Sequence, residues 1–186
     1  GDGEPPKAAG KIRHKQQEMS SVASAGIAHE AYLYADPNDL IQRMAGYVDE
    51  GLRAGEAVLV VVTPTNADAL RTALDGRPKG VTFVDVTTAG RNPGRVISIW
   101  RDWLGAYGRR GGVRGIGEPV WPGRTPSELT ECHHHETLLN LAFGSGPSWR
   151  LICPYDTAAL PAETVQLARS THPVVSDAAG PAASRT

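Results

Sequence analysis

The residues with the clearest chemical potential lie in the segment ECHHHETLLN, residues 131–140, where three histidines stand beside a cysteine and two carboxylates. Such a set could bind a metal ion or supply an acid and a base. A helix turns by roughly 100° per residue, so His133, His134 and His135 point in three directions and cannot share one metal ion. The zinc-protease pattern H-E-x-x-H also fails, because Leu139 stands where its second histidine would be.

Some possible ligand pairs with helical spacing remain in this segment. They are Cys132 with His135, Cys132 with Glu136, and Glu131 with His135. A third ligand would have to come from Cys153, His29 or His172, all remote in sequence. We therefore expect no metal site and no cofactor, and we keep a metal- or haem-binding sensor as an alternative function.

A helical-wheel projection shows which residues of the same segment share a face. It places Leu129, Cys132, Glu136, Leu139 and Phe143 on one face, with His135 and Asn140 flanking that face and His134 exposed. A bare carboxylate among core residues is costly unless it is paired or hydrogen-bonded. Glu136 is therefore either a buried carboxylate satisfied by an arginine or backbone donors, or a carboxylate that lines a pocket.

A second dense segment is GEPVWPGRTPSEL, residues 117–129. Two prolines stiffen the loop around Trp121, and Glu118 and Arg124 stand nearby. This loop could be a recognition surface, or it could pack Trp121 over the core with Arg124 paired to an acid. Nucleophilic catalysis has little support because no G-x-S-x-G elbow occurs, so we expect a non-catalytic protein.

The elements that must position these residues alternate along the chain. Strands are predicted at 29–34, 57–63, 81–87, 113–118 and 148–155, and helices at 36–55, 65–76, 92–110, 125–144 and 160–170. Asp36 and Thr125, each followed by proline, are typical helix starts. The alternation predicts an α/β fold with three layers, in which a mostly parallel five-stranded sheet carries helices on both faces.

In such a sheet, ligands bind beyond the carboxyl ends of the strands. The residues that follow the predicted strands are Asp36, Thr63, Thr65, Asp85, Thr87, Glu118, Trp121, Pro154, Tyr155 and Asp156. The turn after the first strand, YADPND, has no glycine-rich phosphate-binding pattern. We therefore exclude ATP hydrolysis by a phosphate loop.

Composition and the chain ends set the remaining expectations. A formal net charge of -1 argues against direct binding to nucleic acid or to an anionic membrane. The two cysteines, the lack of an apolar run long enough for a membrane span and the lack of a signal peptide favour a cytoplasmic protein with reduced thiols. We expect residues 1–26 to be disordered or weakly helical, 27–175 to form the domain, and 176–186 to be a linker or tail.

Taken together, these segments resemble the MEDS domain, a sensory domain of methanogens, methylotrophs and actinobacteria. The resemblance covers roughly residues 28–175. It rests on H-x-x-x-L-Y at 29–34, EGLRAGE at 50–56, VDVTTAGRNP at 84–93, RGIGEPVWPGR at 114–124, ECHHHETLLNLAF at 131–143, CPYDTAALP at 153–161 and THP at 171–173. His133 and His134 fall at variable positions of the family pattern.

The resemblance implies a degenerate relative of the RecA/KaiC-type ATPases without the phosphate loop. It also implies a sensor of a small-molecule signal that regulates an attached C-terminal output domain. That domain is often an ATPase of the anti-sigma-factor type, which would act on a sigma factor or its antagonist in transcription regulation. Carried over by motif position, the ligand-binding residues are His29, Arg91, Asn92, Glu118, Trp121, Arg124, His135, Glu136, Asn140 and Tyr155. A pure protein-interaction module is the alternative from another functional class.

Overall fold

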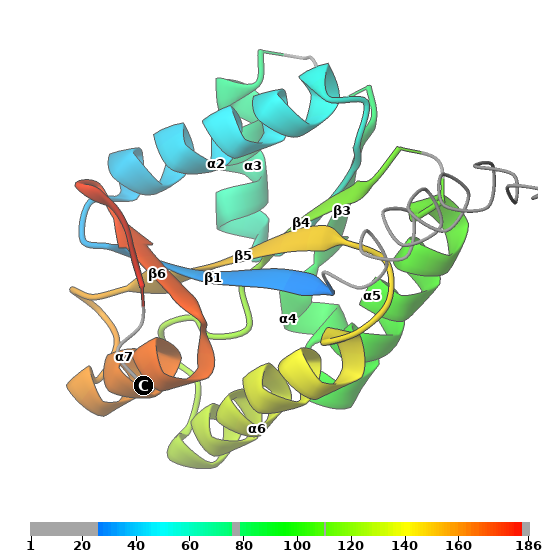
Figure 1. Cartoon of the computed structure of the whole chain (residues 1–186). Helices are drawn as coiled ribbons and strands as arrows, with labels where there is room; N and C mark the ends of the chain where they lie inside the picture. Colours follow the sequence, from blue (N-terminus) through cyan, green and yellow to red (C-terminus); the bar gives the residue numbers. More distant parts are fainter. Residues whose placement is uncertain (1–25, 76–78, 110, 184–186) are drawn as a thin grey trace, which may run out of the picture.

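A single twisted sheet with helices on both faces forms the molecule (Figure 1). The computed structural model describes residues 26–75, 79–109 and 111–183. The strands are β1 (Ile27–Tyr34), β2 (Ala57–Val62), β3 (Val81–Asp85), β4 (Val113–Gly117), β5 (Trp149–Asp156), β6 (Val174–Asp177) and β7 (Gly180–Ala183). They lie in the order β3-β2-β4-β5-β1-β6-β7, and only β7 is antiparallel to its neighbour.

The prediction of a parallel sheet with helices on both faces is confirmed, but the prediction of five strands is wrong. The five expected strands are present as β1 to β5, with bounds within two residues of those predicted. A sixth parallel strand, β6, pairs with β1, and β7 folds back on it as a hairpin. Strands this short carry almost no periodicity, and the prediction of a linker or tail at 176–186 is therefore wrong where β6 and β7 form. The edge of β1 supplies the hydrogen bonds that order β6.

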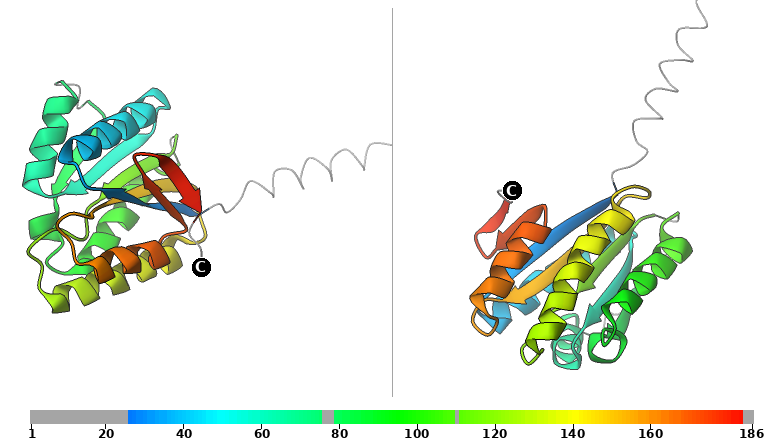
Figure 2. Two further views of the ribbon diagram at one scale, coloured as in Figure 1. Left: turned by 90° about the vertical axis from the view of Figure 1, so that its left-hand side faces the viewer. Right: turned by 90° about the horizontal axis from the view of Figure 1, so that it is seen from below.

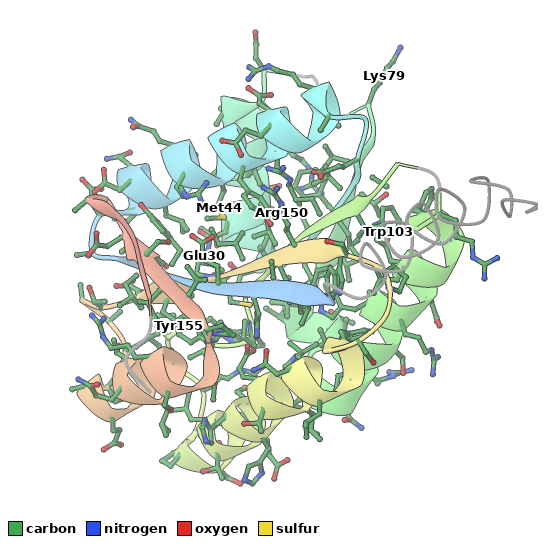
Figure 3. The ribbon with its side chains drawn as sticks, in the orientation of Figure 1. Glu30, Met44, Lys79, Trp103, Arg150 and Tyr155 are labelled. Atoms are coloured by element: carbon green, nitrogen blue, oxygen red, sulfur yellow. The ribbon has the colours of Figure 1, made fainter. Side chains whose placement is uncertain are left out.

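Helices cover the two faces unequally. The helices are α2 (Pro37–Arg53), α3 (Pro64–Ala73), α4 (Val86–Ala89), α5 (Pro93–Tyr107), α6 (Pro126–Phe143) and α7 (Ala162–Thr171). Figures 1 and 2 show α2 and α3 on one face of the sheet, and α5, α6 and α7 side by side on the other. Each face has its own hydrophobic core. Met44 and Tyr155 belong to these opposite cores, as their positions in Figure 3 show.

The caps predicted for the two long helices are present. The side chain of Asp36 accepts a hydrogen bond from the backbone N–H of Asn38 at the start of α2. At the start of α6, Thr125 and Glu128 form a reciprocal capping box. The capping box fixes the residue at which α6 begins.

Gly115 on β4 allows α5 to pack close to the sheet. A Cβ atom at this position would lie 2.7 Å from Cζ3 of Trp100. Trp100 is fully buried and also packs against Trp149 on β5, with ring centroids 5.5 Å apart. Among the described residues, no helix combines the length and the apolar character needed to cross a bilayer.

Candidate functional site

A cluster of four buried side chains lies between the sheet and the helices of the α6–α7 face. It consists of His29 on β1, Glu136 on α6, Cys153 on β5 and His172 directly after α7, and we call it the His–Glu–Cys cluster. Strands β1 and β5 are neighbours, with Ala31 paired to Cys153. Because side chains alternate along a strand, His29 and Cys153 project from the same face of the sheet. Glu136 lies above them on the buried face of α6.

The polar atoms of the cluster converge on one point. Oε2 of Glu136 lies 3.1 Å from Nε2 of His29 and 3.1 Å from Nε2 of His172. Nε2 of His29 is also 3.4 Å from Sγ of Cys153. The four ligating atoms all lie within 4.8 Å of one another, and all four residues are buried. Neither carboxylate oxygen of Glu136 accepts a hydrogen bond of good geometry from any described residue.

The orientation of each histidine ring is set by a hydrogen bond at its other nitrogen. Nδ2 of Asn140 donates to the backbone carbonyl of Thr171 at 2.6 Å, so Oδ1 of Asn140 is the atom that faces Nδ1 of His29, at 3.0 Å. Nδ1 of His172 donates to the carbonyl of Ala168 at 2.8 Å. The hydroxyl of Thr171, 3.1 Å from the same Nδ1, donates to the carbonyl of Leu167. Both rings therefore carry a proton on Nδ1.

Burial and the neighbouring charges have opposite effects on the pKa values of the cluster residues. Burial alone would raise the pKa of Glu136, but the contacts with His172 and His29 outweigh burial and hold that pKa well below its usual range. Burial and the neighbouring His29 lower the pKa of His172, against the pull of Glu136. Burial raises the pKa of Cys153. The low pKa of Glu136 thus requires positive charge near its carboxylate, while burial disfavours that charge on His172.

A cavity of about 400 Å³ adjoins the cluster between α6 and α7. It is lined by Val120, Arg124, Pro126, Leu129, Thr130, Cys132, His133, Glu136, Tyr155, Pro161, Glu163, Thr164, Leu167, Ala168 and Thr171. Most of this lining is apolar. Glu136 belongs to both the cavity and the cluster, and the ring of Tyr155 packs edge-on against His172 with centroids 5.6 Å apart. The cavity lies at the carboxyl end of β5, where a sheet of this kind is expected to bind ligands.

Arg124 is the cationic residue of the cavity wall. Its guanidinium lies 3.5 Å from the ring centroid of Trp121, and one terminal nitrogen donates to the carbonyl of Gly90 at 3.2 Å. Its Nε is buried and has no hydrogen-bond partner among the described residues. Nη1 lies 3.8 Å from Oε1 of Glu128, so Arg124 places a largely buried positive charge beside the apolar wall.

Sequence comparison decides the family. The profile of the MEDS domain, described as the methanogen/methylotroph, DcmR sensory domain, matches residues 28–173. The chain belongs to the MEDS family. The matched region extends from β1 to the residue after His172, so it includes the whole His–Glu–Cys cluster and the cavity. No curated protein matches the chain.

Five of the ten residues predicted to bind ligand come together in this MEDS domain. His29, Glu136 and Asn140 form or support the cluster, and Arg124, Glu136 and Tyr155 line the cavity. Trp121 stacks on Arg124 and so supports the cavity wall from outside. Glu136 was expected to pair with an arginine or backbone donors, or to line a pocket. It lines a pocket, but two histidines face its carboxylate instead.

The other four predicted residues do not line the α6–α7 cavity, although Glu118 and His135 border a small void of about 10 Å³ beside Glu136 and Cys153. Glu118 bonds to the start of α3, and His135 is buried with Nδ1 lacking a partner among the described residues. Among the described residues, Glu118, Arg124, Glu136 and His135 are therefore not joined in one hydrogen-bond network. Arg91 and Asn92 are exposed. Asn92 caps α5 by accepting a hydrogen bond from the N–H of Gly94 at 3.0 Å.

Cys153 and His172 were absent from the predicted ligand set although they complete the cluster. From sequence they are only possible remote ligands, because no spacing links them to Glu136. The only local pattern that points to the site is the alternation that places Cys153 and Tyr155 on one face of β5. His133 also contributes to the cavity wall, whereas His134 is exposed as expected. Both cysteines are free thiols.

Proposed function

We propose that this MEDS domain is a non-catalytic, cytoplasmic signal sensor that binds a small molecule in the α6–α7 cavity. The observation that carries the proposal is the cavity itself, about 400 Å³ in volume, at the carboxyl end of β5. Ligand pockets in proteins are mostly apolar, with a few fixed polar groups that orient the ligand. The walls contributed by Leu129, Leu167 and Ala168 supply the apolar part, and Arg124 and Glu136 supply the polar part.

The wall chemistry defines a class of ligand. Arg124 is the cationic side chain that lines the cavity, which favours a ligand with an acceptor such as a carboxylate. The apolar surface favours a compact apolar body. Signal ligands of this class would be small organic acids or amphipathic molecules with one strong acceptor.

Helix α7 is the proposed route of signal transmission. Thr164, Leu167 and Ala168 line the cavity, and the same helix leads through His172 into β6. A ligand that favours one position of α7 would shift the population of the β6–β7 hairpin. We propose that this shift regulates an output domain of the anti-sigma-factor ATPase type, and through it a sigma factor or its antagonist. Descent from a RecA/KaiC-type ATPase that lost its phosphate loop belongs to the same proposal.

The cavity can be tested by filling it. Leu167→Trp places a large side chain at the cavity wall, on a residue that is 40% exposed. The matched control is Leu141→Trp on α6, which is 75% exposed and does not line the cavity. A panel of small apolar fragments, with and without a carboxylate, is screened by thermal shift and calorimetry. Binding by the wild type and by Leu141→Trp, but not by Leu167→Trp, supports the proposal.

A second substitution tests the role of Arg124. Arg124→Met keeps the packing volume against Trp121 but removes the donor. We expect about tenfold or greater loss of affinity for carboxylate fragments, because one charge-assisted hydrogen bond contributes about 1.5–3 kcal/mol, and little change for neutral fragments. If no fragment stabilises the wild type, or if Leu167→Trp binds as well as the wild type, the cavity is not the sensing site.

A protein-interaction module is the second candidate, on a separate observation. Leu138 and Leu141 lie three residues apart on α6 and are 49% and 75% exposed. A partner that docks on this face would be released by Leu138→Asp combined with Leu141→Asp, whereas Leu167→Trp would leave docking unchanged. Pull-down with the natural output domain separates the two functions.

A further inference from the structure

We propose that the His–Glu–Cys cluster binds one divalent transition-metal ion of the zinc class. The ligands are Nε2 of His29, Nε2 of His172, a carboxylate oxygen of Glu136 and Sγ of Cys153. This goes beyond the proposed sensing function, which requires only the cavity. Four arguments from the described residues support the site: the spacing of the atoms, the lone pairs of the histidines, the hydrogen bonds around the cluster and the balance of charge.

The spacing of the atoms fits tetrahedral coordination. Zinc binds imidazole nitrogen and carboxylate oxygen at about 2.0–2.2 Å and thiolate sulfur at about 2.3 Å, which places neighbouring ligand atoms about 3.3–3.7 Å apart. In the cluster, the separations are 3.1 Å for each Nε2–Oε2 contact and 3.4 Å for Nε2 to Sγ of Cys153. The remaining separations are at most 4.8 Å, and side-chain movements that shorten them would complete a tetrahedral set.

The Nε2 lone pair of His172 faces another acceptor unless a cation lies between them, and that of His29 faces both the same acceptor and the thiol of Cys153. Because Nδ1 of His29 donates to Asn140 and Nδ1 of His172 donates to Ala168, each neutral ring has its lone pair on Nε2. Both Nε2 atoms lie 3.1 Å from the same oxygen of Glu136, which is also an acceptor. A metal ion converts these three acceptors from mutually repelling atoms into ligands.

The hydrogen bonds around the cluster are those that metal-binding histidines use. In metal sites, the second ring nitrogen usually donates to a carbonyl or carboxylate, which fixes the tautomer and the ring orientation. Here His172 donates to a backbone carbonyl, and His29 donates to Asn140, whose amide is itself held by the carbonyl of Thr171. All three supporting contacts come from α6 and α7, so the two helices hold the rings in place for binding at Nε2.

The charge also balances. The two positive charges of the ion neutralise one carboxylate from Glu136 and one thiolate from Cys153, while both histidines remain neutral. Binding releases the thiol proton of Cys153 to solvent. Imidazole nitrogen together with thiolate and carboxylate suits a borderline ion such as Zn²⁺ or Co²⁺, whereas Mg²⁺ and Ca²⁺ prefer oxygen ligands.

Metal analysis of the purified chain, prepared without a histidine tag, tests the proposal. We expect elemental analysis to find about one zinc ion per chain, the content of a single closed site. After chelation, Co²⁺ should bind in the same ratio and give a tetrahedral visible spectrum with a sulfur-to-cobalt charge-transfer band. Cys153→Ser should lose this band and bind more weakly, whereas Cys132→Ser should keep it, because Sγ of Cys132 bonds to the carbonyl of Pro119 outside the cluster.

Further variants separate the site from adventitious binding and from misfolding. His133→Ala with His134→Ala removes two histidines of the same helix outside the cluster and should leave metal content unchanged. Asn140→Ala keeps all four ligands and should weaken affinity about 10- to 100-fold. Glu136→Gln should abolish stoichiometric binding, and circular dichroism confirms that each variant is folded.

The proposal is overturned if the chain binds neither Zn²⁺ nor Co²⁺ stoichiometrically. It is equally overturned if binding disappears with His133 and His134 but survives Glu136→Gln. The cavity-filling Leu167→Trp should retain the metal while losing fragment binding, so the metal site and the sensing cavity can fail independently.

Discussion

Glu118 holds the first turn of α3 through Thr63, whose backbone N–H and hydroxyl both donate to the same carboxylate oxygen, at 2.8 and 3.0 Å. The other oxygen accepts a hydrogen bond from Asn66 at 2.9 Å. Glu118 directly follows β4, and Thr63 directly follows β2, so this contact ties two neighbouring strand ends to a helix of the opposite face. The carboxylate that looked like a ligand group is a structural bridge.

The bridge should make stability depend on pH. Burial raises the pKa of Glu118 above its ordinary value of 4.5, hydrogen bonds from Thr63 and Asn66 oppose this, and the charge of Asp156 adds to it. Tyr34 also faces Glu118. Because the folded pKa is the higher one, the carboxyl contributes most stability below 4.5 and loses that contribution as the pH rises through the folded pKa.

Glu118→Gln removes this titration while keeping the side-chain shape. Relative to the variant, we expect the wild type to lose up to about 1.4 kcal/mol of unfolding free energy per pH unit as the pH rises from 4.5 to the folded pKa of Glu118. Urea unfolding of both proteins across the acidic to neutral range measures the difference. A wild-type advantage that grows with pH would contradict the assigned direction of the pKa.

Arg114 on β4 should be a major source of stability. It is 4% exposed, donates to Glu56 at 2.6 Å, and uses one terminal nitrogen for Glu50 and for the carbonyl of Tyr47, both at 3.0 Å. Arg114→Met should cost about 2–3 kcal/mol, less than a fully buried pair because the glutamates reach solvent. Urea unfolding measures this cost. The exposed pair of Arg101 with Asp102 is the control, and Arg101→Met should leave the midpoint unchanged.

Two glycine substitutions should have opposite signs. A Cβ at Gly115 would lie 2.7 Å from Trp100, so Gly115→Ala should destabilise the domain by about 1–3 kcal/mol through overpacking. Gly46, exposed within α2, has no neighbouring atom within 4 Å of such a Cβ. Gly46→Ala should therefore stabilise the domain by about 0.5–1 kcal/mol through helix propensity. Thermal unfolding of both variants checks the pair, and equal signs would contradict the packing described for α5.

The β6–β7 hairpin should be an integral part of the sheet. Val175 is buried in the core of the α6–α7 face, and Ser176 donates a hydrogen bond to Glu30 on β1. Val175→Asp buries an unpaired charge and should cost about 3 kcal/mol, limited by detachment of the hairpin from β1. An exposed β1 edge should also promote self-association, which light scattering detects. Ala179→Asp, in the exposed turn between the two strands, should do neither.

Much of the fold was predictable because its signals are local. The caps at Asp36 and Thr125, the apolar run of β2 and the helical period of α6 depend only on neighbouring residues, and each is confirmed. The helical projection likewise predicted that Cys132 and Glu136 face the core, as they do. The hairpin at 174–183 was missed because four-residue strands have too short a pattern to be distinguished from a linker.

The candidate site was predictable only in part, because its residues come from segments that are remote in sequence. Motif resemblance pointed to His29, Glu136 and Asn140 without indicating that they meet. Asn92 and Glu118 are polar residues at the ends of elements, and from sequence a helix cap or a strand-end bridge looks the same as a ligand contact. Only their hydrogen bonds to Gly94 and Thr63 separate these roles.

By itself, the sequence determined the first five strands and the long helices, the buried face of α6 and the dispersal of its three consecutive histidines around the helix. The tertiary structure decided which distant residues share a site. His29 and Cys153 are 124 residues apart, yet their side chains are in contact because β1 inserts between β5 and β6. Strand order depends on backbone pairing and core packing between remote segments. The periodicity of one segment contains no information about either. For that reason the partners of Glu136 became visible only in the folded chain.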